Sequence, residues 1–93
     1  MQNNSLDGKI AVITGGGSGI GKAAAIRLAS SGAKIALVDL KEENSKKVKE
    51  LIEKAGGEAI VTDTDVSDPY RVEDSIREVV EKWGRVDIVF ANA

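Results

Sequence analysis

The chain has 93 residues, of which 42% are apolar and 30% are charged, and its formal net charge is −2. One domain or part of one is expected, and a chain of this length buries only roughly 60–65% of its unfolded surface on folding. The interspersed, nearly balanced charge gives no footprint for nucleic acid or for an anionic membrane. With no cysteine and no histidine, disulfides and the usual zinc ligands are excluded, and no metal site is expected.

The start of the chain is polar. The first nine residues, MQNNSLDGK, lack the apolar region of a secretory signal. No apolar run approaches the ~20 residues that span a bilayer. We therefore expect a cytoplasmic protein that binds neither a membrane nor nucleic acid.

Short apolar runs of the buried-strand type alternate with amphipathic stretches along the chain. The expected strands are residues 9–14 (KIAVIT), 33–40 (AKIALVDL), 58–66 (EAIVTDTDV) and 85–93 (RVDIVFANA). Helices are expected from Gly19 to about Gly32, over residues 41–55, and from the N-cap Ser67 to Gly84. Strands that alternate with helices in this way predict an α/β fold with a parallel sheet and right-handed crossovers.

Half of the ten glycines lie between Gly15 and Gly21, in the stretch GGGSGIG. A flexible linker would have polar, structureless flanks, but here a buried strand and a helix adjoin the glycines directly. Glycine permits unusual backbone angles and close approach of a ligand, and the following helix offers unpaired N–H groups that favour a phosphate. The stretch therefore predicts a phosphate-binding loop. It is not a P-loop, because Ala23 follows Lys22 where a hydroxyl is required.

The spacing Thr14-Gly15-x-x-x-Gly19-x-Gly21 resembles the signature T-G-x-x-x-G-x-G of the short-chain dehydrogenase/reductase family. The resemblance implies a sharp turn at Gly15, close approach of a pyrophosphate at Gly19, and packing of helix on strand at Gly21. It also implies hydrogen bonds to the phosphates and ribose of a dinucleotide from Gly17, Ser18 and Ile20.

Asp39 closes the second expected strand, 18 residues beyond Gly21. A carboxylate at this point can accept both hydroxyls of an adenosine ribose. It would repel the 2′-phosphate of NADP, since two charges ~4 Å apart interact by ~4 kcal/mol at an effective dielectric constant of ~20. We therefore expect NAD rather than NADP, although Lys41 lies near enough to keep NADP open.

Two further stretches match the family. Asp65-Val66 stands where the family binds the adenine edge and flanks the ring. The end of the chain, GRVDIVFANA, resembles the fourth strand running into N-N-A-G, with Ala91 in place of the first Asn. Asn92 would then lie beside the adenosine ribose and hold the central strands, although it can also be a simple strand-end amide. A calcium loop in DTDVSD is excluded, because Asp68 and Asp74 stand where glycine and glutamate are required.

The resemblance implies a Rossmann-type sheet of strand order 3-2-1-4, with residues 1–93 as the cofactor-binding part of one domain, truncated after the fourth strand. The first two helices should cover one face of the sheet and the third the other. The fourth strand would be an open apolar edge, which invites association or low stability. The family's catalytic Ser and Y-x-x-x-K pair belong to a later part of its domain. Tyr70 is the only tyrosine and is followed four residues later by Asp74, so no catalytic residue is assigned.

Three functions are compatible with these residues. The first is an NAD-dependent oxidoreductase that acts on a small alcohol or ketone as a homo-oligomer, with this chain as its cofactor-binding half. The second is a non-catalytic nucleotide-binding module or sensor. The third is a methyltransferase, although that class usually has G-x-G-x-G in this loop.

Overall fold

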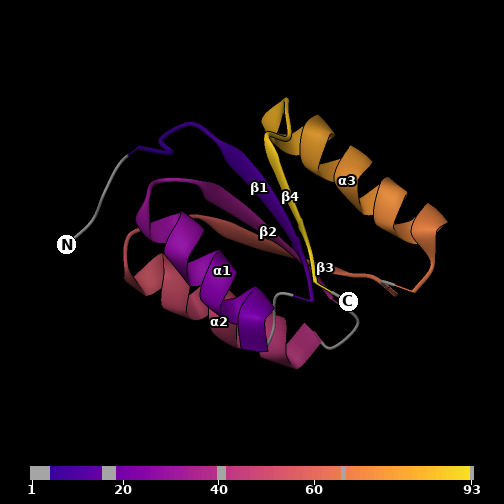
Figure 1. Cartoon of the computed structure of the whole chain (residues 1–93), viewed down its shortest axis with the longest axis horizontal. Coiled ribbons are helices and arrows are strands. Elements are labelled where there is room, and N and C mark those ends of the chain that lie inside the picture. Colours follow the sequence, from indigo (N-terminus) through magenta and orange to yellow (C-terminus); the bar gives the residue numbers. More distant parts are fainter. Residues whose placement is uncertain (1–4, 16–18, 40–41, 66, 93) are drawn as a thin grey trace.

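The computed structural model describes residues 5–15, 19–39, 42–65 and 67–92. Strands and helices alternate throughout these ranges, as the hydrophobic periodicity predicted (Figure 1). The elements are β1 (Ile10–Thr14), α1 (Gly19–Ser30), β2 (Lys34–Asp39), α2 (Glu42–Lys54), β3 (Ala59–Asp63), α3 (Pro69–Trp83) and β4 (Ile88–Ala91). No helix in these ranges combines the length and the apolar character that a membrane crossing requires.

The strands form one parallel sheet in the order β3-β2-β1-β4. Val12, at the centre of β1, pairs in register with Ala36 of β2 on one side and Val89 of β4 on the other. The chain thus builds the sheet outward from β1 to β3 and then returns to the opposite side of β1. The predicted strand order 3-2-1-4 is confirmed.

Both faces of the central strands are buried, which explains why β1 and β2 are apolar at successive positions. One set of alternate side chains packs under α1 and α2, and the other set packs under α3. The first cluster includes Ala11, Ile13, Ile35, Leu37, Val48 and Ile52. The second includes Ile10, Val12, Ala36, Val38 and Val79. The expected division of helices, two on one face and one on the other, is confirmed (Figure 1).

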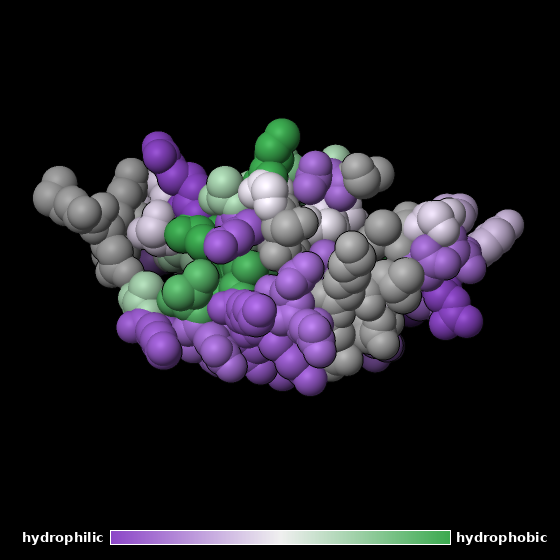
Figure 2. Space-filling model, turned by 90° about the horizontal axis from the view of Figure 1, so that it is seen from below, coloured by the Kyte–Doolittle hydropathy of each residue, from purple (hydrophilic) through white to green (hydrophobic). Residues whose placement is uncertain are grey.

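The outer surface of α1 and α2 is mainly hydrophilic, with a smaller hydrophobic area (Figure 2). Ile26 of α1 and Leu51 of α2 are partly exposed there, on either side of a shallow hollow of about 60 Å³. The hollow is also lined by Ser30 and Gly57, which place it toward the amino-terminal ends of β2 and β3.

The start of α3 differs from the expectation. Ser67 was the expected N-cap, but Asp68 is the N-cap, and its Oδ1 accepts a hydrogen bond from the backbone N–H of Tyr70 at 3.0 Å. Asp68 has the extended backbone (φ −101°, ψ 106°) that an N-cap requires. The Ser67 hydroxyl instead donates to Asp65. Pro69 lies in the first turn, as expected, and Gly84 ends the helix in the left-handed conformation (φ +87°).

The amino-terminal ends of the strands are held to α3 by contacts among three side chains. Trp83 at the end of α3 donates from Nε1 to Glu58 Oε2 at 3.1 Å, next to the start of β3. The ammonium group of Lys34 lies 3.9 Å from Glu58 Oε1 and 5.7 Å from the centre of the Trp83 ring. These contacts join α3 to β2 and β3, far from the carboxyl ends of the strands.

Candidate functional site

The predicted site residues that the structure describes gather at the carboxyl ends of the four strands. Gly15 follows β1, Asp39 ends β2, Asp65 lies just beyond β3, and Asn92 follows β4. The strand order reverses between β1 and β4, and in open α/β sheets ligands bind in the crevice at such a reversal. Gly17, Ser18 and Val66, which belong to the predicted site, lie outside the described residues.

The ends of β1 and β4 are joined by hydrogen bonds. The hydroxyl Oγ1 of Thr14 accepts from the Asn92 N–H at 2.9 Å and donates to the Phe90 carbonyl at 3.5 Å. The Asn92 side-chain amide donates to the Gly15 carbonyl at 3.4 Å, and the Gly15 N–H donates to the Val38 carbonyl at 2.8 Å. The turn after β1 is therefore held by both neighbouring strands, β2 and β4.

Two glycines allow this close packing. Gly15 has φ +66°, and a Cβ there would meet the Asn92 carbonyl oxygen. A Cβ on Gly21 would meet the Gly15 carbonyl oxygen and would lie 2.9 Å from the Asn92 side-chain nitrogen. Because a larger residue does not fit at either position, α1 can lie directly against the end of β1.

Gly19 has different surroundings. It begins α1 with φ +58°, and a Cβ there would have no other part of the described protein within 4 Å. Ile20, next along the helix, is 70% exposed. The first turn of a helix has N–H groups without helical partners and carries the positive end of the helix dipole. Among the described residues, no atom would contact a Cβ on Gly19, and the first turn of α1 is electrostatically suited to an anion.

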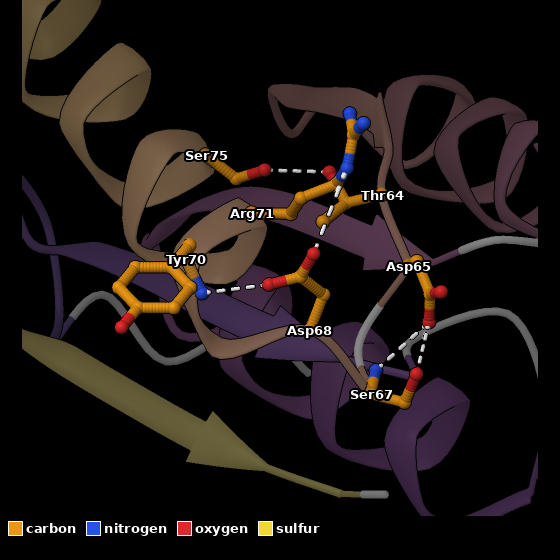
Figure 3. A network of polar contacts seen from close by, with 7 residues as sticks. All are labelled: Thr64, Asp65, Ser67, Asp68, Tyr70, Arg71 and Ser75. Atoms are coloured by element: carbon orange, nitrogen blue, oxygen red, sulfur yellow. Dashed lines mark hydrogen bonds and ion pairs between the residues drawn. The ribbon is translucent and has the colours of Figure 1, made fainter.

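Asp39 and Asp65 lie on adjacent strand ends. The Asp39 carbonyl accepts the Thr64 N–H at 3.1 Å, which extends the pairing of β2 with β3 by one residue. Asp65 is exposed, and its Oδ1 accepts two hydrogen bonds from Ser67, one from the N–H at 3.0 Å and one from the hydroxyl at 2.6 Å (Figure 3). These bonds stabilise the charged carboxylate and hold the Asp65 pKa below its usual value.

Sequence reasoning missed the contacts of three polar residues here, although it named Thr14 in the glycine motif and Ser67 as an N-cap. Thr14 joins β1 to β4, Ser67 binds Asp65, and Ser75 on α3 shares a buried hydrogen bond of 2.5 Å with the Thr64 hydroxyl (Figure 3). A hydroxyl at the end of the otherwise apolar β1 was a usable signal for Thr14. The contact between Thr64 and Ser75 had no such signal, because it depends on how α3 lies on the sheet.

Comparison with known proteins identifies the family. The family model for short chain dehydrogenases matches residues 9–93. An uncharacterized oxidoreductase of Thermotoga maritima is 45% identical over 89 residues, which are 96% of this chain and 35% of that protein. The short-chain dehydrogenase/reductase homolog YusS of Bacillus subtilis is 44% identical over 86 residues, which are 91% of this chain and 79% of that protein.

A solved structure matches over nearly the whole chain as well. The crystal structure of NAD⁺-bound xylitol dehydrogenase superposes with a TM-score of 0.90 at 36% identity, over 96% of this chain and 34% of that one. The fold and the sequence thus define the same class, a Rossmann-type fold. The chain belongs to the short-chain dehydrogenase family. It spans about a third of the length of the Thermotoga oxidoreductase and of xylitol dehydrogenase.

Proposed function

We propose that this chain is the cofactor-binding part, residues 1–93, of one Rossmann domain in an NAD-dependent oxidoreductase. The observation that carries the proposal is the geometry at Gly19, where α1 begins at the strand-order reversal and no described atom lies within 4 Å of an added Cβ. The NAD⁺-bound state of the similar xylitol dehydrogenase supports the choice of cofactor. When bound, the nicotinamide supplies the hydride chemistry, and the protein supplies position and electrostatics.

Each group of candidate residues suits a different part of the proposed cofactor. The pyrophosphate would lie on the turn and first amides of α1, with Gly15, Gly17, Ser18, Gly19 and Ile20. The Asp39 carboxylate would accept the adenosine ribose hydroxyls and repel a 2′-phosphate, which favours NAD over NADP. Asp65 and Val66 would hold the adenine. Asn92 would lie beside the ribose. Its side-chain amide donates to the Gly15 carbonyl in the turn after β1.

The reaction we propose is hydride transfer between the nicotinamide and a small alcohol or its ketone, in a cytoplasmic homo-oligomer. We place the catalytic serine, tyrosine and lysine of the family outside these 93 residues. Tyr70 is 78% exposed at the start of α3, and Asp74 stands four residues later, where the family has lysine. A serine followed about a dozen residues later by Y-x-x-x-K, encoded downstream of Ala93, is expected from the family order.

Calorimetric titration with NAD, NADP and S-adenosylmethionine tests the proposal. Calorimetry suits this chain better than Trp83 fluorescence, because Trp83 contacts Glu58 at the amino-terminal ends of the strands, away from the proposed site. We expect NAD to bind most tightly. In the variant Asp39→Asn, the ratio of NAD affinity to NADP affinity should fall about tenfold. This corresponds to the loss of ~1.4 kcal/mol of repulsion between the carboxylate and the 2′-phosphate.

The matched control is Asp74→Asn, which removes an exposed acid that pairs with Arg77 at 3.5 Å along the surface of α3. It should leave the preference unchanged. Tighter binding of NADP than of NAD by the unmodified chain would contradict the role of Asp39. Binding of S-adenosylmethionine alone would favour a methyltransferase, and no binding of any of the three would refute the proposal.

A further inference from the structure

The position of Asp65 relative to the sheet is fixed by the residue before it. Thr64 is 5% exposed, and its N–H donates to the Asp39 carbonyl at 3.1 Å. Its hydroxyl shares the 2.5 Å hydrogen bond with Ser75, which is 4% exposed on α3. A buried hydroxyl pair of this kind is costly to break, because Ser75 would lose a hydrogen bond away from water and Thr64 would keep its weaker 3.4 Å bond to Thr62. The backbone entering Asp65 is therefore anchored to β2 and to α3 (Figure 3).

The side chain of Asp65 is fixed from the other direction, by Ser67. Both hydrogen bonds from Ser67 end on the same carboxylate oxygen, Oδ1. Neither of them uses Oδ2, which points away from Ser67 (Figure 3). A carboxylate held in this way is ionised and acts only as a hydrogen-bond acceptor. It can accept a hydrogen bond from an amino group on a ligand, but it repels a carbonyl oxygen at the same place.

We propose that Ser67 is a positioning residue that makes the site select a purine with a 6-amino group over one with a 6-carbonyl group. The inference rests on the proposed binding of a dinucleotide with its base at Asp65. Ser67 need not touch the ligand. Ser67 holds Oδ1 in place. This keeps Oδ2 pointing in one direction, where it can accept a hydrogen bond from the 6-amino group of adenine.

The experiment compares two dinucleotides that differ only at this group, NAD and nicotinamide hypoxanthine dinucleotide. Calorimetry on the unmodified chain should give at least about tenfold tighter binding of NAD, the size expected for one hydrogen bond to a charged group. Ser67→Ala removes one of the two bonds to Oδ1 and should reduce this ratio by about threefold or more. Ser67→Thr keeps the hydroxyl and should retain the ratio.

Two further variants separate this role from a general structural one. Ser30→Ala removes a hydroxyl that donates to the Arg27 carbonyl at 2.7 Å, at the far end of α1, and should leave the ratio unchanged. Asp65→Asn replaces the acceptor with a group that can also donate to a carbonyl, so it should abolish the preference. A variant that only loosens the fold lowers both affinities together and leaves their ratio intact.

The outcomes distinguish the inference from the proposed function. If the unmodified chain binds both dinucleotides equally, cofactor binding stands but base selection by Asp65 and Ser67 is wrong. If Ser67→Ala keeps the original ratio, or lowers both affinities in parallel, Ser67 is not a positioning residue. If the unmodified chain binds neither dinucleotide, the proposed function and this inference both fail.

Discussion

At the scale of single residues, Asp87 joins the start of β4 to the start of β1. Its Oδ2 accepts the Ile10 N–H at 2.9 Å, while its own N–H donates to the Ile10 carbonyl at 2.9 Å. The Arg85 guanidinium donates to both carboxylate oxygens at 2.8–3.0 Å. The Arg85 hydrogen bonds, and next the Ile10 bond, hold the Asp87 pKa below its usual value. Asp87 therefore stabilises the folded state in its ionised form.

This lowered pKa predicts how stability depends on pH. The contribution of Asp87 is fully present above the unfolded-state pKa of about 3.9 and is lost as the pH falls through the lower folded-state value. The difference in unfolding free energy between the unmodified chain and Asp87→Asn should thus be constant above about pH 5 and shrink below about pH 4. Urea unfolding followed by circular dichroism measures it. The lowered pKa of Asp65 is common to both proteins and cancels.

Asp74→Asn is the control for this comparison, because its pairing with Arg77 is on the exposed surface of α3. Exposed ion pairs of this type contribute little to stability. A gap between the unmodified chain and Asp87→Asn that stays constant down to about pH 3 would show that the Arg85 and Ile10 contacts do not stabilise the carboxylate in solution.

At the scale of elements, the sequence predicted which segments form strands and helices better than it predicted how the helices begin. The continuous apolar runs at residues 9–14 and 33–40 predicted β1 and β2, because both strands are buried on both faces. Ser67 and Asp68 are both good N-cap residues by type. Only the structure shows that Asp68 is the cap, while the Ser67 hydroxyl donates to Asp65. Local propensity does not distinguish two adjacent capping residues whose partners depend on the turn.

The cap of α3 gives a second prediction. Asp68→Ala should lower the free energy of unfolding by about 1 kcal/mol, because the Tyr70 N–H loses its acceptor at the helix start. Ser67→Ala is the matched control and should cost markedly less, since Ser67 is exposed and is not the cap. Chemical unfolding of the two variants under identical conditions measures the difference. An equal loss for both, or a larger loss for Ser67→Ala, would contradict the assignment of the cap.

At the scale of the whole molecule, the sheet is covered unequally. Val89 of β4 is 54% exposed, although the equivalent positions on β1 and β2, Val12 and Ala36, are fully buried. No described strand pairs with the outer side of β4. The expectation that this chain associates or is poorly stable alone stays a prediction. A sharp thermal transition of a monomer, independent of protein concentration, would contradict it.

The placement of candidate-site residues at the ends of strands was predicted from the sequence, since the topology brings all such ends together. This holds for Gly15, Asp39 and Asn92. The resemblance predicted that Asn92 holds the central strands, which its bonds to Thr14 and Gly15 confirm, but it did not predict which contacts do so. The bond of Asn92 to Thr14 joins positions 78 residues apart, and the Thr64–Ser75 bond requires the docking of α3. Spacing along the chain carries no information about either contact.

The central claim is that a diphosphate binds at the start of α1, and Gly19→Ala tests it most directly. The added methyl group meets no described protein atom within 4 Å, so it would occupy the space assigned to the ligand. Gly56→Ala is the matched control, because Gly56 also has positive φ (+91°) and equally open surroundings, but lies beyond the end of α2. Both variants should lose about 1–2 kcal/mol of stability through backbone strain.

The measurement is calorimetric titration of NAD into the two variants and the unmodified chain. We expect Gly56→Ala to bind NAD as the unmodified chain does, and Gly19→Ala to bind at least about tenfold more weakly, a loss of ~1.4 kcal/mol. NAD binding by Gly19→Ala with unchanged affinity would contradict the claim.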